Sequence, residues 1–152
     1  MSIEKDISQS KFRNEYQKGV INIIYTHNWV MEKTKIIFDK GNITSQQFNI
    51  LRILRGASGP LSTLQIRQRM LDKMSDTSRI VVRLIAKDLV KKVVCETDKR
   101  LVDVTITEKG KKLLEELDQY EPDVDAVLGK LSLAEVETLN ILLDKIRNST
   151  ES

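Results

Sequence analysis

The spacing of apolar residues changes at Leu89, and this change limits the folds open to the chain. Before it, residues 63–87 carry apolar side chains at intervals of three and four, as amphipathic helices do. After it, residues 90–107 alternate between apolar and polar, which is the pattern of strands, with the turn-like sequence TDKR in between. The sequence therefore predicts two short helices followed at once by a two-stranded antiparallel hairpin.

The two helices carry different surfaces. The first is predicted from Thr63 to about Leu71, after Ser62 and Gln65 in capping-box spacing. The second is predicted from Asp76 to about Lys87, with Ser75 as its N-cap. Its inward side is expected to be Thr77, Ile80, Val81 and Leu84, and its outward side Ser75, Asp76, Ser78, Arg79, Val82 and Arg83. Such a pair is a helix-turn-helix, and the hairpin makes it a winged helix.

The segments on either side are also helical in pattern. One long helix is predicted over about residues 7–39, with an apolar stripe formed by Phe12, Tyr16, Val20, Ile23, Ile24, His27, Val30, Met31, Thr34, Ile37 and Phe38. The stripe is longer than so small a domain can easily cover, so part of it is expected to meet another subunit, with ordinary core as the alternative. Gly41 ends this helix and Thr44 with Gln47 starts the next.

The C-terminal third repeats this helical pattern. Thr107 is predicted to cap a helix over about residues 108–120, and Pro122 marks a break. Ser132 and Glu135 form a further capping box before the last apolar helix. The predicted fold is mainly α with a small β-hairpin wing.

Charge is unevenly distributed along the 152 residues. The segment 62–111 holds twelve Lys and Arg against seven Asp and Glu, a net +5, although the whole chain carries only +3. A module that touches a polyanion shows this pattern, and so does a solvated basic face. The single cysteine excludes an internal disulfide framework. No stretch reads as a signal peptide or membrane span, so the expectation is a cytoplasmic protein with no membrane partner.

The hairpin tip is rich in charge, and binding to DNA would explain that charge. A recognition helix fits the major groove, and a hairpin beside it reaches the neighbouring minor groove or phosphates. Arg100 is the candidate for a narrow A·T-rich minor groove, with Asp98 holding it extended through a charge-assisted hydrogen bond. Lys91, Lys92 and Lys99 are candidates for phosphate contacts.

The same residues resemble a known family. Asp98-x-Arg100, five residues, then Ile106-Thr107-x-x-Gly110 resembles the DxRx(5)LTxxG signature of the MarR family of bacterial transcription regulators, with Ile in place of Leu. The resemblance extends over nearly the whole chain. It implies one MarR-like domain over residues 1–152, with dimerisation helices at about 7–39 and 108–148 around a winged helix-turn-helix at about 44–107. It also implies a homodimer on a pseudo-palindromic site of double-stranded DNA.

Carried over position by position, the family's contacts fall on defined residues. Those to the major groove fall near Ser75, Asp76, Ser78, Arg79 and Arg83, and the minor-groove arginine falls on Arg100. Three departures stand out. Asp88 replaces the usual Gly, although Asp tolerates the left-handed conformation. Arg67 replaces a common Ala, and Asp76 places an acid at the DNA face, either as a helix cap or as an acceptor from a cytosine amino group.

Many members of this family release DNA when a small, often aromatic or anionic, molecule lodges between the dimerisation helices and the winged helix. By that analogy the ligand-binding residues are Tyr16, Ile23, His27, Trp29, Met31, Phe48, Leu51 and Arg55, with plain core or dimer interface as the alternative. His27 and Cys95 cannot make a common zinc site unaided, and Cys95 is either a redox sensor or a plain strand residue.

The resulting prediction is a sequence-specific DNA-binding transcriptional regulator, a homodimeric repressor relieved by a small-molecule ligand. No cofactor or catalytic site is expected, because no spacing proposes a nucleophile with its base. The alternative is a winged helix used for protein-protein interaction without DNA, because one fold can serve many functions. Exposed Arg79, Arg83 and Arg100 favour DNA.

Overall fold

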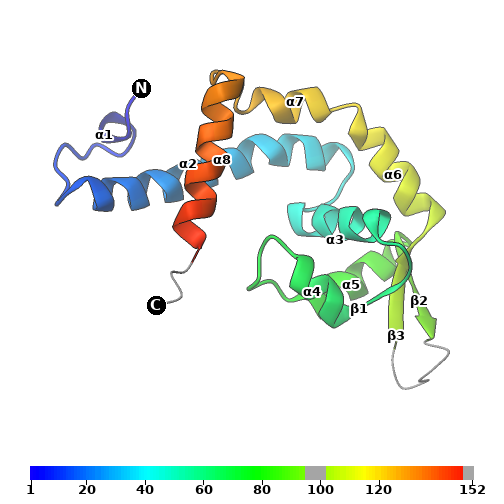
Figure 1. Ribbon diagram of the computed structural model, residues 1–152. Helices are drawn as coiled ribbons and strands as arrows, with labels where there is room; N and C mark the ends of the chain where they lie inside the picture. The colour runs from blue at the N-terminus through cyan, green and yellow to red at the C-terminus, as the bar shows by residue number, and fades with distance from the viewer. Residues whose placement is uncertain (95–101, 149–152) are drawn as a thin grey trace. The chain divides into compact units, whose positions relative to one another are not determined.

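The computed structural model describes residues 1–94 and 102–148, and it divides into two compact units, Met1–Leu117 and Asp118–Ser152. The first unit carries the sheet and most of the helices (Figure 1). Its elements are α1 (Ile3–Asp6), α2 (Glu15–Lys40), α3 (Ser45–Gly56), β1 (Leu61–Ser62), α4 (Thr63–Arg69), α5 (Thr77–Ala86), β2 (Val90–Val94), β3 (Val102–Ile106) and α6 (Glu108–Asp118). The second unit carries α7 (Glu121–Ala126) and α8 (Leu133–Arg147).

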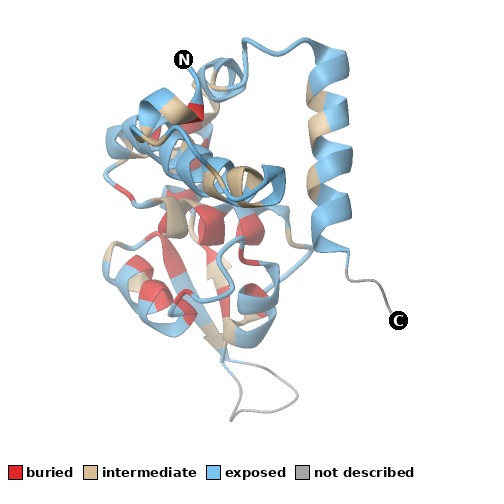
Figure 2. Ribbon diagram, turned by 90° about the vertical axis from the view of Figure 1, so that its left-hand side faces the viewer, coloured by how far each residue is buried: buried red, intermediate tan, exposed pale blue. Residues whose placement is uncertain are grey.

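The winged helix is the part with a continuous core. Its sheet is antiparallel in the order β1-β3-β2, and β3 pairs with β2 from Val102 opposite Val94 to Ile106 opposite Val90. Buried residues concentrate here, coloured red in Figure 2. The most deeply buried large side chains are Ile50, Leu51, Ile66, Leu84 and Val90 of the winged helix, together with Leu114 of α6. The predicted hairpin is confirmed, whereas the short β1, which pairs Leu61 with Val104, was not predicted.

The prediction of one helix over 7–39 is wrong at its start. The chain forms the short α1 and then breaks, with Ser8 at φ 53° in the left-handed region, before Asn14 caps α2 by accepting from Gln17 N at 2.9 Å. Lys18 on α2 lies 2.5 Å from the Glu4 carboxylate on α1. The hydrogen bond from Lys18, followed by the backbone of Glu4, lowers the pKa of Glu4 to about 2. This ion pair joins the first short helix to the long one.

Helix α2 carries much uncovered apolar surface. Only Ile37 among its 26 residues is buried in the single chain. The C-terminal end of its stripe is covered, because Phe38 stacks on Phe48 of α3 with ring centroids 4.7 Å apart. The N-terminal half is open to solvent, with exposed Tyr16, Val20, Ile23, Ile24, Tyr25 and Trp29. The stripe therefore continues past the part that the chain's own core covers.

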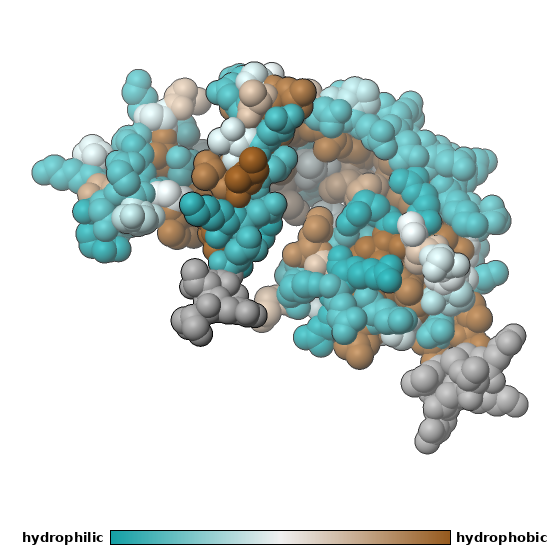
Figure 3. All heavy atoms as spheres, in the orientation of Figure 1, coloured by the Kyte–Doolittle hydropathy of each residue, from teal (hydrophilic) through white to brown (hydrophobic). Residues whose placement is uncertain are grey.

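Helix α8 shows the same feature within its own unit. None of its residues is buried, and Leu133, Ile141, Leu142 and Ile146 are exposed. Figure 3 shows hydrophobic side chains, in brown, on the face of this helix that is turned to the viewer. An apolar helix that buries nothing of its own is unusual for an isolated domain.

The predicted helix starts are confirmed at three capping boxes. Thr44 with Gln47, Ser62 with Gln65 and Ser132 with Glu135 each satisfy two backbone donors reciprocally. Hydrogen bonds from the backbone and then the side chain of Ser132 lower the pKa of Glu135. The break at Pro122 is confirmed too, since α6 ends at Asp118 and the proline lies in the first turn of α7.

Candidate nucleic-acid interface

The turn between α4 and α5 is fixed by hydrogen bonds. The buried Asn49 of α3 accepts from Leu71 N at 2.9 Å through its Oδ1, so the turn is bound to the core. Within the turn, Asp72 Oδ1 accepts from Met74 N at 2.9 Å, and Ser75 Oγ donates to the Asp72 carbonyl at 2.8 Å. These bonds set where the next helix begins. The start of α5 is therefore held at a defined position against α3.

Asp76, not Ser75, is the N-cap of α5. Its Oδ1 accepts from Arg79 N at 3.2 Å, which confirms the capping alternative for this acid. The prediction that Ser75 caps the helix and faces outward is wrong: Ser75 is buried, and its hydroxyl is used inside the turn. Ser and Asp are both good caps, so local sequence does not rank them. The tertiary bond from Asn49 fixes the turn, and with it the first helical residue.

The outward side of α5 otherwise lies as predicted. Thr77, Ile80, Val81 and Leu84 are buried, whereas Ser78, Arg79, Val82 and Arg83 are exposed. A hollow of about 490 Å³ lies beside the start of this helix, lined by Thr63, Leu64, Arg67, Met74, Ser75, Asp76, Thr77 and Ser78. In the sequence, Arg67 stood out only because it replaces an alanine that is common in the family. Its exposed position on α4 adds a cation to this hollow, which the i, i+3 and i+4 spacing along α4 could have indicated.

The wing supplies further positive charge. Lys91 and Lys92 on β2 are exposed, as a phosphate contact requires. Four wing residues named from the sequence lie outside the described residues: the predicted DNA contacts Asp98, Lys99 and Arg100, and Cys95 with its two alternatives. Their proposed contacts therefore rest on the sequence.

The junction between α5 and the wing explains the Thr-x-x-Gly part of the motif. Thr107 Oγ1 donates to the Asp88 carbonyl at 2.8 Å and accepts from Gly110 N at 3.0 Å, so it joins the end of α5 to the start of α6. At Gly110 a Cβ atom would lie 2.4 Å from the Leu89 carbonyl oxygen. Only glycine fits this close approach. Asp88 adopts φ 62°, which confirms that it takes the left-handed conformation in place of a glycine.

This conformation gives a stability prediction. Asp88→Gly is expected to raise the free energy of unfolding by about 1 kcal/mol, because a residue with a Cβ pays for φ > 0 and glycine does not. Urea titration of both proteins measures the difference. Asp72→Gly, in the exposed turn where the side chain accepts a hydrogen bond, is the control and is expected to destabilise. A destabilised Asp88→Gly protein would contradict the prediction.

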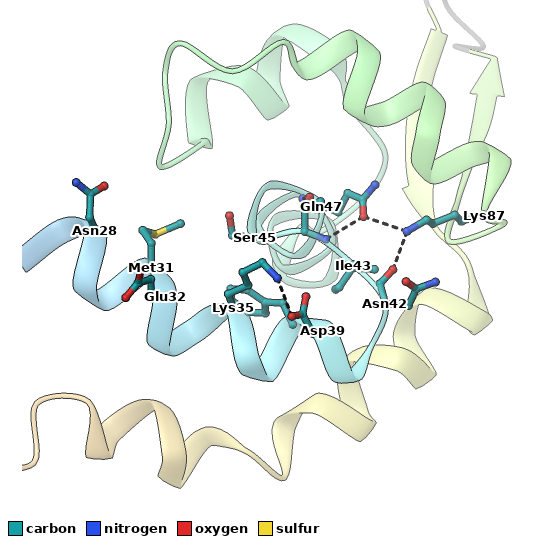
Figure 4. A pocket seen from close by; sticks show the side chains of 12 residues that line it. Asn28, Met31, Glu32, Lys35, Asp39, Asn42, Ile43, Ser45, Gln47 and Lys87 are labelled. Carbon is teal, nitrogen blue, oxygen red and sulfur yellow. Dashed lines mark hydrogen bonds and ion pairs between the residues drawn. The ribbon is translucent and has the colours of Figure 1, made fainter.

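A second hollow lies where α2 meets α3. It has a volume of about 780 Å³ and is lined by Asn28, Met31, Glu32, Lys35, Phe38, Asp39, Asn42, Ile43, Thr44, Ser45, Gln47 and Lys87. Figure 4 shows Lys87 reaching it from the end of α5, with its ammonium directed at Asn42 and Gln47. On the opposite wall Lys35 is paired with Asp39 at 2.8 Å. The hollow thus combines apolar groups with two lysines and two carboxylates, those of Glu32 and Asp39.

The residues predicted for ligand binding do not gather in one place. Met31 alone among them lines this hollow. Leu51 is fully buried in the core, and Phe48 is half-buried beneath Phe38. The others have exposed side chains on α2 or α3, namely Tyr16, Ile23, His27, Trp29 and Arg55.

The fold and this surface define a winged helix-turn-helix protein whose second helix presents arginines to solvent. No family model matches the chain. It is 32% identical over 110 residues to the HTH-type transcriptional regulator MgrA of Staphylococcus aureus. The aligned residues make up 72% of this chain and 74% of MgrA. The chain belongs to the MarR family of transcriptional regulators, which its wing sequence resembles.

Solved structures agree on the fold. A cysteine-to-serine mutant of MarR from E. coli, complexed with operator DNA, aligns with TM-score 0.81 at 24% identity over 91% of this chain and 99% of its own. BpsR of Bordetella bronchiseptica, whose DNA binding is regulated by 6-hydroxynicotinic acid, aligns with TM-score 0.79 at 23% identity over 92% and 99%. None of the helices within residues 1–94 and 102–148 has both the length and the hydropathy of a membrane span.

Proposed function

We propose that this chain is a homodimeric, sequence-specific DNA-binding repressor, relieved by a small-molecule ligand. In this proposal residues 1–152 act as one MarR-like domain, without catalytic activity, in the cytoplasm where the chromosome lies. The observation that carries it is the capped helix α5, which buries one face in the core and exposes Ser78, Arg79 and Arg83 on the other. Arginine is the residue that most often reads guanine in the major groove.

The contacts divide by role. Ser78, Arg79 and Arg83 are proposed to read base edges, and Asp76 to hold the start of the helix that carries them. Lys91 and Lys92 are proposed to contact phosphates, with Lys99 beside them, and Arg100 the minor groove with Asp98 as its support. Ser75 contributes through the turn instead of touching DNA, because its side chain is buried. The MarR structure with operator DNA supports this arrangement by analogy of fold.

A second copy of the chain is the proposed cover for the apolar helices. The uncovered stripe of α2 continues directly from its packed end, and α8 buries nothing by itself. Exposed apolar patches of this extent mark interfaces, and twofold dimers are the commonest soluble assembly. A dimer also matches a pseudo-palindromic operator, in which each half-site meets one winged helix.

The hollow between α2 and α3 is the proposed ligand site. Its volume of about 780 Å³ suits a small organic molecule, and Lys87, whose two acceptors are uncharged, is the cation in the lining that an anionic ligand would meet. Regulation of BpsR by 6-hydroxynicotinic acid supports a ligand of this kind by analogy. Of the residues named from the sequence, Met31 belongs to this site; Tyr16, Ile23, His27 and Trp29 are better explained as dimer surface.

The rival function is protein-protein interaction without DNA. It would suit an apolar or acidic exposed face on α5, whereas this helix exposes two arginines, one serine and a single large apolar residue, Val82. Selecting fragments from the host's genomic DNA with the purified protein decides between the two. Recovery of a common pseudo-palindromic sequence supports the repressor. Enrichment of no fragment over a protein-free control supports the rival.

Arg79→Ala is expected to weaken binding to the selected duplex by about 1–3 kcal/mol and to relax preference at one base position, as loss of a base-reading arginine does. Titration of selected and scrambled duplexes at fixed salt measures both effects. Arg52→Ala, at an exposed position on α3, is the matched control and should leave both affinities unchanged. Equal losses on the two duplexes would mean that Arg79 only touches phosphate.

A further inference from the structure

Lys87 lies at the C-cap of α5, four residues after Arg83 and eight after Arg79. Helical spacing alone places it next to the arginine row, as one more cation for DNA. Its contacts differ from that expectation. Lys87 Nζ donates to the Asn42 carbonyl at 2.7 Å and to Gln47 Oε1 at 3.2 Å, so its ammonium points into the fold (Figure 4).

Both acceptors belong to the α2–α3 elbow, residues 41–47. Asn42 adopts φ 53°, so the backbone turns sharply there and presents its carbonyl. Gln47 is buried, and the same Oε1 accepts from Thr44 N at 3.0 Å in the capping box that starts α3. The lysine therefore binds to a point that already fixes the geometry between the two helices.

The same end of α5 is also held from the other side. Lys109 Nζ donates to the Lys87 carbonyl at 3.2 Å, and Thr107 Oγ1 donates to the Asp88 carbonyl. These bonds satisfy carbonyls at the negative end of the helix dipole. The lysine side chain is the part of this arrangement that reaches the elbow, forty or more positions away in sequence.

We propose that Lys87 is a positioning residue: it holds the C-terminal end of the recognition helix against the α2–α3 elbow and so sets the angle at which Arg79 and Arg83 meet the operator. This inference rests on the proposed DNA-binding function. A small rotation at one end displaces side chains at the other, and base readout depends on their placement within fractions of an ångström. Because Lys87 also lines the proposed ligand site, an anion bound there competes for the same ammonium.

The test compares Lys87→Met with Lys87→Arg, which keeps the charge and the donors. Lys91→Met, at an exposed lysine of β2, is the matched control. Each protein is titrated with the genomically selected duplex and a scrambled duplex over a series of salt concentrations. Lys87→Met is expected to lose about tenfold in affinity for the selected duplex, with the scrambled duplex and the salt slope unchanged. Lys87→Arg should recover most of the loss.

The control has a different signature. Lys91→Met should weaken both duplexes alike and reduce the salt slope by about one, as loss of a phosphate contact does. The same signature in Lys87→Met would overturn the inference, and so would unchanged affinity for the selected duplex. Amide hydrogen exchange without DNA provides a second readout: residues 42–47 and 87–89 should exchange faster in Lys87→Met.

The two proposals fail in different ways. A wild-type protein with no preference for any duplex refutes the DNA-binding function, and the positioning role falls with it. A wild-type protein that prefers its operator, together with a Lys87→Met variant that binds it equally well, refutes the positioning role alone. Unchanged exchange at residues 42–47 in that variant would separately show that the elbow does not depend on the lysine.

Discussion

Ile23→Asp is expected to convert the protein to a monomer and to lower its affinity for a two-half-site operator by about a hundredfold or more, because the second winged helix no longer binds at high effective concentration. Ile23 lies in the uncovered stripe of α2 and is 46% exposed in the single chain. A carboxylate there would have to be desolvated in the interface, which is costly without a partner. Analytical ultracentrifugation and operator titration measure the two effects.

Asn22→Asp is the matched control for this change. It places the same charge one residue earlier on α2, on a different side of the helix, at an exposed position. The control should remain dimeric and bind its operator normally. The monomer should also stay folded, because Ile23 is not part of the chain's own core. A dimeric Ile23→Asp protein with full operator affinity would show that another surface makes the interface.

Gly110→Val has the largest expected effect on stability, a loss of about 3 kcal/mol in the free energy of unfolding, which lowers Tm by about 10 °C. The added Cβ would lie 2.4 Å from the Leu89 carbonyl oxygen and 2.7 Å from Ile106 Cγ1. To remove this overlap, the start of α6 would have to move away from the junction between α5 and the wing, where Thr107 also donates a hydrogen bond to the Asp88 carbonyl. Thermal unfolding followed by circular dichroism measures the shift.

Gly56→Ala is the control for Gly110. A Cβ at Gly56, the last residue of α3, meets nothing within 4 Å. This variant is expected to be neutral or more stable by up to about 1 kcal/mol, because alanine restricts the unfolded chain. Wild-type stability in Gly110→Val would mean that the close packing of α6 on the α5–β2 junction does not contribute to the fold.

Much of the candidate interface was predictable because its signals are local. The outward side of α5 follows from helical period, and Ser78, Arg79 and Arg83 are exposed as that period requires. The left-handed conformation of Asp88 was expected from the family resemblance, which places this residue where a glycine is usual. Arg67 and Lys87 were not assigned functional places. Folding brings Arg67 to the hollow beside α5 and Lys87 to the α2–α3 elbow.

The sequence by itself indicated the two wing strands, the family that the chain resembles, and the helices other than the short α1 and α7 and the start of α2. Capping boxes and the apolar period depend on residues a few positions apart, so they can be recognised in the sequence. The Thr-x-x-Gly motif was recognised from the family resemblance, and its contacts to Asp88 and Leu89 are seen only in the structure. Only the tertiary structure decided that Ser75 turns inward, that Leu61 and Ser62 add a third strand, and that Lys87 binds the elbow. Ser75 bonds locally to Asp72, but in a turn that Asn49 holds from α3. The third strand and the Lys87 contact depend directly on partners far along the chain.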